Sequence, residues 1–221
     1  MLLIFDLDDT LYQSFELRKN REDAFINLIM KHKKLEFEKA KELYHSTQEK
    51  LKSEGKKYTS RETFHNLGIE LKEFESVLNE IKIDGFVKKD DSLIKLLKNL
   101  SKSHKIIVLS NSPRFIVDKT IELLGIRDFI DKSFAAEDIG IGKPEPSVLR
   151  KIAEEMGYKT KDCVSIGDSV HKEIIPAKKV GMKTVLLLAK TINIPKEEQK
   201  EADFVINELR ELPGILKQIS L

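Results

Sequence analysis

Leu2-Leu3-Ile4-Phe5, followed directly by Asp6-Leu7-Asp8, is the stretch that decides how this chain folds. Four consecutive apolar residues predict a strand that is buried on both faces. Side chains alternate along an extended chain, so the carboxylates of Asp6 and Asp8 tend toward the same side at the carboxyl end of that strand. Burying an ionised carboxylate is costly unless a cation or hydrogen bonds compensate. The pair therefore indicates a metal ion, a shared proton or phosphate chemistry, with an Asx turn at the strand end as the simpler alternative.

Composition limits the class of protein and the kind of partner. The chain has 221 residues, and 39 Lys and Arg against 37 Asp and Glu leave a net charge of +2, which gives no support to a nucleic-acid or membrane-surface partner. Its single cysteine, Cys163, fits a reducing compartment. Met1 leads straight into the strand, and no apolar stretch is long enough to cross a bilayer. We expect a cytoplasmic protein that is a monomer or a homodimer.

Residues 14–83 predict a separate helical segment. No strand-like run occurs there, and apolar residues recur at three- and four-residue intervals, which places each set on one helix face. The set comprises Phe25, Leu28, Ile29, Leu35, Leu71, Phe74, Val77, Leu78 and Ile81. Gly55 and Gly68 are expected breaks. The segment is long enough for a small helical bundle inserted into another domain.

The rest of the chain, residues 1–13 and 84–221, alternates strands with helices. Apolar runs at 106–109 and 163–166, a short one around Phe134, and two more at 185–188 and 204–206 predict further strands. Asp90 or Asp91 is expected to cap one helix, and Ser112 another that has Pro113 at its first position. This pattern is typical of an α/β fold with a parallel sheet covered on both faces.

Reactive side chains follow these strands. Asp6 and Asp8, Ser110, and Asp168 come at strand carboxyl ends, where such sheets bind ligands, and Lys143 lies on a loop that enters a helix. Such a set suits phosphoryl transfer. One carboxylate can attack phosphorus, a second can act as acid and base, and Lys143 with hydroxyl and amide donors can bind the phosphoryl oxygens. Asp6 with Asp168 offers hard oxygen ligands, which favour Mg²⁺ over zinc.

Four segments also carry a family resemblance. In order they are Asp6-Leu7-Asp8-Asp9-Thr10-Leu11, Leu109-Ser110-Asn111-Ser112, Gly142-Lys143-Pro144 and Ile166-Gly167-Asp168-Ser169. Together they resemble the four motifs of the haloacid dehalogenase (HAD) superfamily. The resemblance implies a doubly wound, Rossmann-like parallel sheet with strand order 5-4-1-2-3 and an α-helical cap inserted after the first motif.

The resemblance also implies roles for individual residues. Asp6 would be the nucleophile and Asp8 the general acid and base, and Mg²⁺ would bind the carboxylates of Asp6 and Asp168 and the backbone carbonyl of Asp8. The phosphoryl oxygens would be held by Ser110 and Lys143, with the amides of Asn111 and Leu7 assisting. Many members have a second Asp five residues after the position of Asp168, where this chain has Glu173, which we expect to reach the metal through water at most.

The implied activity is a Mg²⁺-dependent phosphatase that hydrolyses a small phosphorylated metabolite through an aspartyl-phosphate on Asp6. The carboxyl of Asp8 favours phosphate esters over carbon–halogen bonds, since the dehalogenases lack it. Tyr12 and Arg114 follow the first and second motifs, so they are candidates to face the substrate, whereas we expect His171 to be a surface residue.

Three alternatives stay open. A phosphomutase of the same superfamily would share the covalent step, although mutases often have Val at the position of Thr10. A phospho-acceptor signalling domain would have neither the helical insert nor the second acid. A catalytically idle binding scaffold differs from an enzyme only in activity, and the sequence contains no motif for a particular substrate.

Overall fold

A computed structural model describes residues 1–140, 142–188 and 193–219, and the chain divides into two compact units. The first unit consists of residues 1–13 and 87–221, and the second of residues 14–86. The boundary after the second unit therefore lies three residues beyond the expected one at 83/84.

The first unit is built on a six-stranded parallel sheet with the order β3-β2-β1-β4-β5-β6. The strands are β1 (Leu2–Phe5), β2 (Lys105–Ser110), β3 (Lys132–Ala135), β4 (Cys163–Gly167), β5 (Lys183–Leu187) and β6 (Phe204–Ile206). The α/β class with a parallel sheet is confirmed. The order contains the expected 5-4-1-2-3 arrangement and adds β6 at the edge beside β5.

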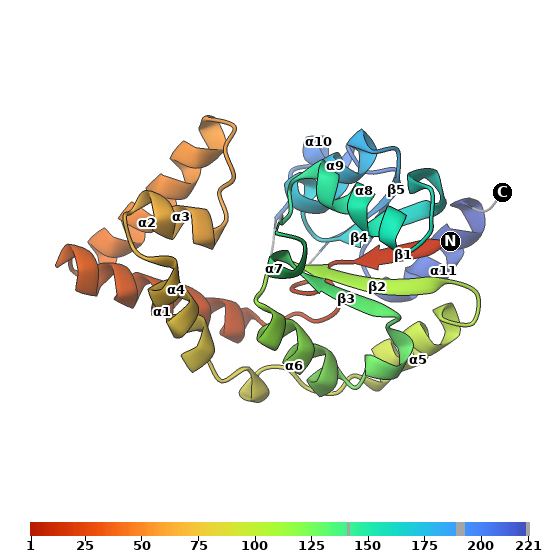
Figure 1. The fold of residues 1–221 in the computed structure, drawn as a ribbon, viewed down its shortest axis with the longest axis horizontal. Coiled ribbons are helices and arrows are strands. Elements are labelled where there is room, and N and C mark those ends of the chain that lie inside the picture. Colours follow the sequence, from red (N-terminus) through yellow and green to blue (C-terminus); the bar gives the residue numbers. More distant parts are fainter. Residues whose placement is uncertain (141, 189–192, 220–221) are drawn as a thin grey trace. The chain divides into compact units, whose positions relative to one another are not determined.

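Helices cover both faces of this sheet, with α8 and α9 on one side and α5 and α6 on the other (Figure 1). The helices of this unit are α5 (Asp91–Leu100), α6 (Arg114–Leu124), α7 (Ala136–Ile139), α8 (Pro146–Glu155), α9 (Ile175–Lys179), α10 (Lys196–Gln199) and α11 (Leu212–Ile219). Short 3₁₀ turns lie at Arg127–Phe129, Thr160–Asp162 and Leu209–Glu211, and a π-helical turn at Val170–Ile174. Coverage on both faces explains why every residue of β1 is buried.

Of the two helix caps expected from the sequence in this unit, one forms. The Asp90 side chain caps α5 by accepting hydrogen bonds from the amides of Ser92 and Leu93, as expected. The prediction that Ser112 caps the next helix was wrong. The cap residue of α6 is Pro113, with no side-chain hydrogen bond, and the Ser112 hydroxyl is bound elsewhere.

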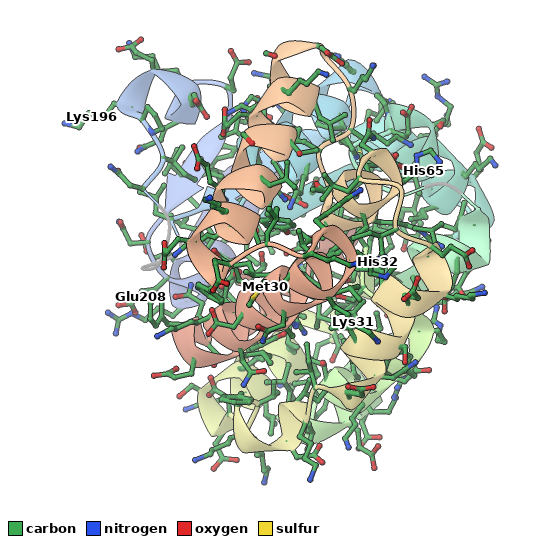
Figure 2. All side chains as sticks on the ribbon, turned by 90° about the vertical axis from the view of Figure 1, so that its left-hand side faces the viewer. Met30, Lys31, His32, His65, Lys196 and Glu208 are labelled. Atoms are coloured by element: carbon green, nitrogen blue, oxygen red, sulfur yellow. The ribbon has the colours of Figure 1, made fainter. Side chains whose placement is uncertain are left out.

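The second unit is helical, as the periodicity predicts. It contains α1 (Phe15–Lys33), α2 (Phe37–Ser53), α3 (Ser60–Asn66), α4 (Leu71–Glu80) and a 3₁₀ turn at Ile83–Gly85. Phe25, Phe64 and Phe74 pack together with ring centroids 5.1–5.4 Å apart, which joins α1, α3 and α4 in one core. Near the end of α1, His32 contacts Glu73 of α4 at 2.8 Å (Figure 2).

None of the helices in the described residues is both long enough and apolar enough to span a membrane.

Candidate active site

Parallel pairing brings the predicted strand-end residues to one edge of the sheet. β1 lies between β2 and β4, with Phe5 opposite Val108 and Ile166. Asp6 directly follows β1, Ser110 ends β2 and Asp168 directly follows β4, so all three lie at the carboxyl edge. All three side chains are buried.

Asp6 is held at the centre of this edge by contacts to both of its carboxylate oxygens. The Lys143 ammonium pairs with Oδ1, and the Thr10 hydroxyl donates to Oδ2 at 3.0 Å. The Asp6 amide donates to the carbonyl of Ile166 at 2.9 Å, which ties the residue to the neighbouring strand β4. A buried carboxylate with two defined partners has a fixed orientation, as a nucleophile requires.

Asp8 accepts hydrogen bonds from three hydroxyl groups. Tyr12 donates to its Oδ1 at 2.5 Å, whereas Ser112 and Ser110 donate to its Oδ2 at 3.0 and 3.4 Å. Neither the Ser112 contact nor the Thr10 contact was expected from the sequence, which favoured Ser112 as a helix cap. The spacing of Ser112 could have indicated its contact. In an extended chain, a residue two positions after Ser110 points to the same side as Ser110.

The side chain of Asn111 binds the backbone of Lys143. Its Nδ2 donates to the carbonyl of Lys143, and its Oδ1 accepts from the Lys143 amide, both at 2.9 Å. The side chain therefore clamps the backbone of the loop that presents the Lys143 ammonium. Only the Asn111 backbone amide is left for the expected role in phosphate binding.

Glu173 is bound to the lysine of the site. Its Oε1 pairs with the Lys143 ammonium at 2.8 Å, and its Oε2 accepts from the Ser169 amide at 3.0 Å. It lies in the π-helical turn Val170–Ile174, and its side chain passes over Gly167, where an added Cβ would be 2.3 Å from the Glu173 Cγ. Both oxygens thus have protein partners, and the expected contact of Glu173 with a metal through water stays a prediction.

Ionisable groups are concentrated at this edge. Of the residues in the ranges 1–140, 142–188 and 193–219, only four charged side chains are buried, namely Asp6, Lys143, Asp168 and Glu173. Burial by itself would lower the pKa of Lys143, but the carboxylates of Asp6 and Glu173 outweigh it and raise that pKa above its usual value. A positive charge is therefore held in the site at any physiological pH.

The pKa values of two buried acids, Asp168 and Glu173, are raised as well, which favours the neutral form of each. Burial, reinforced by the charges of Asp6 and Glu173, raises the pKa of Asp168 to about 8. Burial also raises the pKa of Glu173, although Lys143 opposes the shift. This edge holds three buried carboxyl groups and one buried ammonium, which pairs with Asp6 and Glu173, so a further positive charge would be stabilised there. Clusters of buried groups with perturbed pKa values are typical of functional sites.

The donor set fits Mg²⁺ and is small. No group of three or more His, Cys, Asp or Glu side chains in the described ranges is arranged to hold a metal ion. The expected set needs only two side chains, Asp6 and Asp168, with the backbone carbonyl of Asp8 as a third oxygen. These are hard ligands, and Mg²⁺ is commonly bound by one or two carboxylates with water completing its shell.

Arg114 is not brought into the site. Its guanidinium pairs with Asp138 and with Asp118 at 3.3 Å, and it donates to the Ser133 hydroxyl and carbonyl at 2.8 and 2.9 Å. These contacts join the start of α6 to β3 and α7.

Two other residues also have no contact with this cluster among the contacts described. His171 is 3.5 Å from Glu198. Cys163 is buried in the sheet core, where burial raises its pKa to about 11.

A family model described as haloacid dehalogenase-like hydrolase matches residues 1–181. The chain belongs to this hydrolase family. It is 28% identical to a Methanocaldococcus jannaschii protein named glyceraldehyde 3-phosphate phosphatase, with 98% of this chain and 97% of the relative covered. Membership confirms the resemblance carried by the four motifs.

Solved structures of HAD proteins share the fold. A HAD phosphatase from Thermococcus onnurineus matches with a TM-score of 0.73 at 22% identity over 97% of both chains. A HAD hydrolase from Bacillus subtilis, described as bound to magnesium and as revealing interdomain movement, matches with a TM-score of 0.65 at 19% identity over 97% of both chains. At these identities the likeness concerns the fold.

Proposed function

We propose that this HAD hydrolase is a Mg²⁺-dependent phosphatase that acts on a small phosphorylated metabolite through an aspartyl-phosphate on Asp6. The observation that carries the proposal is the buried Asp6 carboxylate, held by Lys143 and Thr10, with the separate carboxyl of Asp8 among hydroxyl donors nearby. Two acids in different environments suit two chemical roles. The Thr10 contact also favours a phosphatase over a phosphomutase, since the valine common in mutases has no hydroxyl to donate.

In the first step, a carboxylate oxygen of Asp6 attacks phosphorus and the bond to the ester oxygen breaks. The protonated carboxyl of Asp8 gives its proton to that leaving oxygen, so an alcohol departs. The Lys143 ammonium, the Ser110 hydroxyl and the amides of Leu7 and Asn111 bind the phosphoryl oxygens, on which negative charge is concentrated.

In the second step, the carboxylate of Asp8 removes a proton from water as the water oxygen attacks phosphorus. The bond between phosphorus and Asp6 breaks, which restores both carboxyl groups and releases inorganic phosphate. Each step is thus a displacement by a positioned nucleophile with a proton transfer to or from Asp8.

Mg²⁺ would be held by the carboxylates of Asp6 and Asp168 and the backbone carbonyl of Asp8. When bound, it supplies positive charge that neutralises the phosphoryl group and the surplus of buried carboxylates. Glu173 anchors Lys143 in this scheme and is not a ligand of the metal.

The helical unit, residues 14–86, would act as a cap over the active site. Its insertion directly after the first motif supports this assignment, because a unit joined there could exclude water and large molecules from the reaction. The name of the Methanocaldococcus jannaschii relative makes glyceraldehyde 3-phosphate the first substrate to try. The single cysteine supports a cytoplasmic location, and a monomer or homodimer remains our expectation.

The test is phosphate release from a panel of small esters that includes glyceraldehyde 3-phosphate, phosphoglycolate and p-nitrophenyl phosphate, with Mg²⁺ or with EDTA. We expect Mg²⁺-dependent release, its loss in Asp6→Asn, and unchanged release in Asp128→Asn, which changes an exposed carboxylate of the same type. Near-wild-type turnover by Asp6→Asn would contradict the covalent mechanism. A folded, Mg²⁺-loaded wild type that releases no phosphate from any ester would contradict the phosphatase and favour the mutase or the idle scaffold.

A further inference from the structure

The hydroxyl of Tyr12 makes a contact that the reaction scheme above does not use. It donates to Asp8 Oδ1 at 2.5 Å, and the same two residues form an isolated backbone bridge. Tyr12 is half-buried and lies four residues after Asp8, in the turn that follows β1. The phenol is therefore fixed on the acid rather than on the nucleophile.

The other oxygen of the same carboxyl is held from a different segment. Ser112 donates to Asp8 Oδ2 at 3.0 Å and Ser110 at 3.4 Å, and the Ser110 hydroxyl also accepts from the Ser112 amide at 3.0 Å. A hydroxyl from the turn after β1 thus binds one carboxylate oxygen of Asp8, and hydroxyls from β2 and the loop after it bind the other. Hydrogen bonds to both oxygens restrict rotation of the carboxyl group.

The type of partner matters as much as its position. A hydroxyl can donate a hydrogen bond to a carboxylate or accept one from a carboxylic acid, whereas an ammonium or guanidinium group only donates. Hydroxyl partners therefore remain satisfied in both protonation states of Asp8. At the same edge of the sheet, the Lys143 ammonium pairs with Asp6 and Glu173.

We propose that Tyr12 is a positioning residue for proton transfer by Asp8, with Ser112 as its counterpart on the second oxygen. The inference rests on the proposed phosphatase function. Its place in the reaction is the first step, in which Asp6 forms the new bond to phosphorus, the bond to the ester oxygen breaks, and the Asp8 proton moves to that oxygen. Tyr12 and Ser112 hold the carboxyl while the proton leaves and contribute no proton of their own.

Dependence on the leaving group separates this role from a merely structural one. An alkoxide is a poor leaving group and needs the Asp8 proton, whereas 4-nitrophenolate departs readily without it. The measurement is kcat/KM, which covers the steps up to departure of the leaving group, for glyceraldehyde 3-phosphate and for p-nitrophenyl phosphate. The variant is Tyr12→Phe, which removes only the hydroxyl, and the matched control is Tyr158→Phe, a half-buried tyrosine that packs beside α8.

We expect Tyr12→Phe to lower kcat/KM for the alkyl ester about tenfold or more and to leave the value for the aryl ester within about threefold. Ser112→Ala should show the same split, and Tyr158→Phe none. In an Asp8→Asn background, Tyr12→Phe should cause no further split, because the group it positions is gone.

Equal losses for both esters, or no loss for either, would overturn the inference while leaving the phosphatase intact. A split that persists in full in the Asp8→Asn background would also overturn it, since Tyr12 would then act independently of Asp8. A wild type that is inert toward both esters would instead refute the proposed function itself. Thermal unfolding of each variant shows whether its fold is retained, and Ser112→Ala supplies the same test if Tyr12→Phe does not fold.

Discussion

Replacing Lys143 with Met should destabilise the protein strongly, because it removes the ammonium shared by two buried carboxylates. Lys143, Asp6 and Glu173 are 5%, 8% and 3% exposed, and the distance between the Lys143 ammonium and Glu173 Oε1 is 2.8 Å. Methionine has a similar length and apolar stem, so packing changes little and the electrostatic loss dominates. Removing one partner of a buried ion pair costs about 3–5 kcal/mol.

That loss corresponds to a fall in Tm of roughly 6–20 °C for a chain of this size. The assay is thermal unfolding followed by circular dichroism in EDTA, with Lys151→Met as the control for loss of one exposed lysine on α8. The loss should be larger at pH 8 than at pH 5. The reason is that Glu173, whose pKa burial already raises, can take up a proton at the lower pH once its partner is gone.

A second substitution checks the cause. Adding Glu173→Gln to Lys143→Met removes one of the two stranded carboxylates, so the double variant should recover part of the lost stability. A Tm within about 2 °C of wild type for Lys143→Met, or a double variant less stable than the single one, would refute the reasoning that the ammonium neutralises a buried cluster.

Three further predictions concern the same edge of the sheet. Since the pKa of Asp168 is raised from 3.8 to about 8, the folded metal-free protein retains a proton that the unfolded chain has lost, and its free energy of unfolding should fall by a few kcal/mol as pH rises from about 4 to 8. Asp168→Asn should flatten that slope and raise Tm at pH 8 in EDTA while abolishing the gain on adding Mg²⁺; an unchanged slope would argue against the shifted pKa. Gly167→Ala should lower stability by about 1–3 kcal/mol in urea unfolding and reduce turnover, because the new Cβ would lie 2.3 Å from the Glu173 Cγ; a wild-type profile would mean that Glu173 is not held against Gly167. Asn111→Ala should leave the Lys143 loop without both 2.9 Å contacts and reduce kcat/KM by about tenfold, with a normal Tm and full activity as the contrary result.

The strands of the fold were predictable because a parallel sheet buries its strands on both faces. Leu2–Phe5 and Lys105–Ser110 each contain an uninterrupted apolar run, and pairing of β1 with β2 and β4 then forces Asp6, Ser110 and Asp168 to one edge. This topological consequence needs no knowledge of side-chain contacts. It explains why the residues at the edge could be named in advance. The place of β6, a short strand at the edge of the sheet, was harder to predict.

The partners of those residues were not predictable, because each side chain has several possible hydrogen bonds and the sequence does not show which one forms. Ser112 had the position of a helix cap, yet its hydroxyl binds Asp8, 104 residues away in sequence. Asn111 was expected to assist through its amide, and nothing in the sequence indicated that its side chain binds the backbone of Lys143. Arg114 was a candidate to face the substrate and instead pairs with Asp118 and Asp138. Local rules rank possible contacts, and tertiary packing selects among them.

Glu173 explains how one departure from the family's motif is accommodated. The π-helical turn at Val170–Ile174 carries Glu173 back over β4, and the absence of a side chain at Gly167 leaves space for its methylene groups. With that space its carboxylate reaches both the Ser169 amide and the Lys143 ammonium. The ammonium is thereby paired with Glu173 as well as with Asp6, and the Asn111 side chain binds the backbone of the same lysine. Gly167, the turn and the longer acid are therefore parts of one arrangement, and a change in any of them should alter the position of the charge that faces the nucleophile.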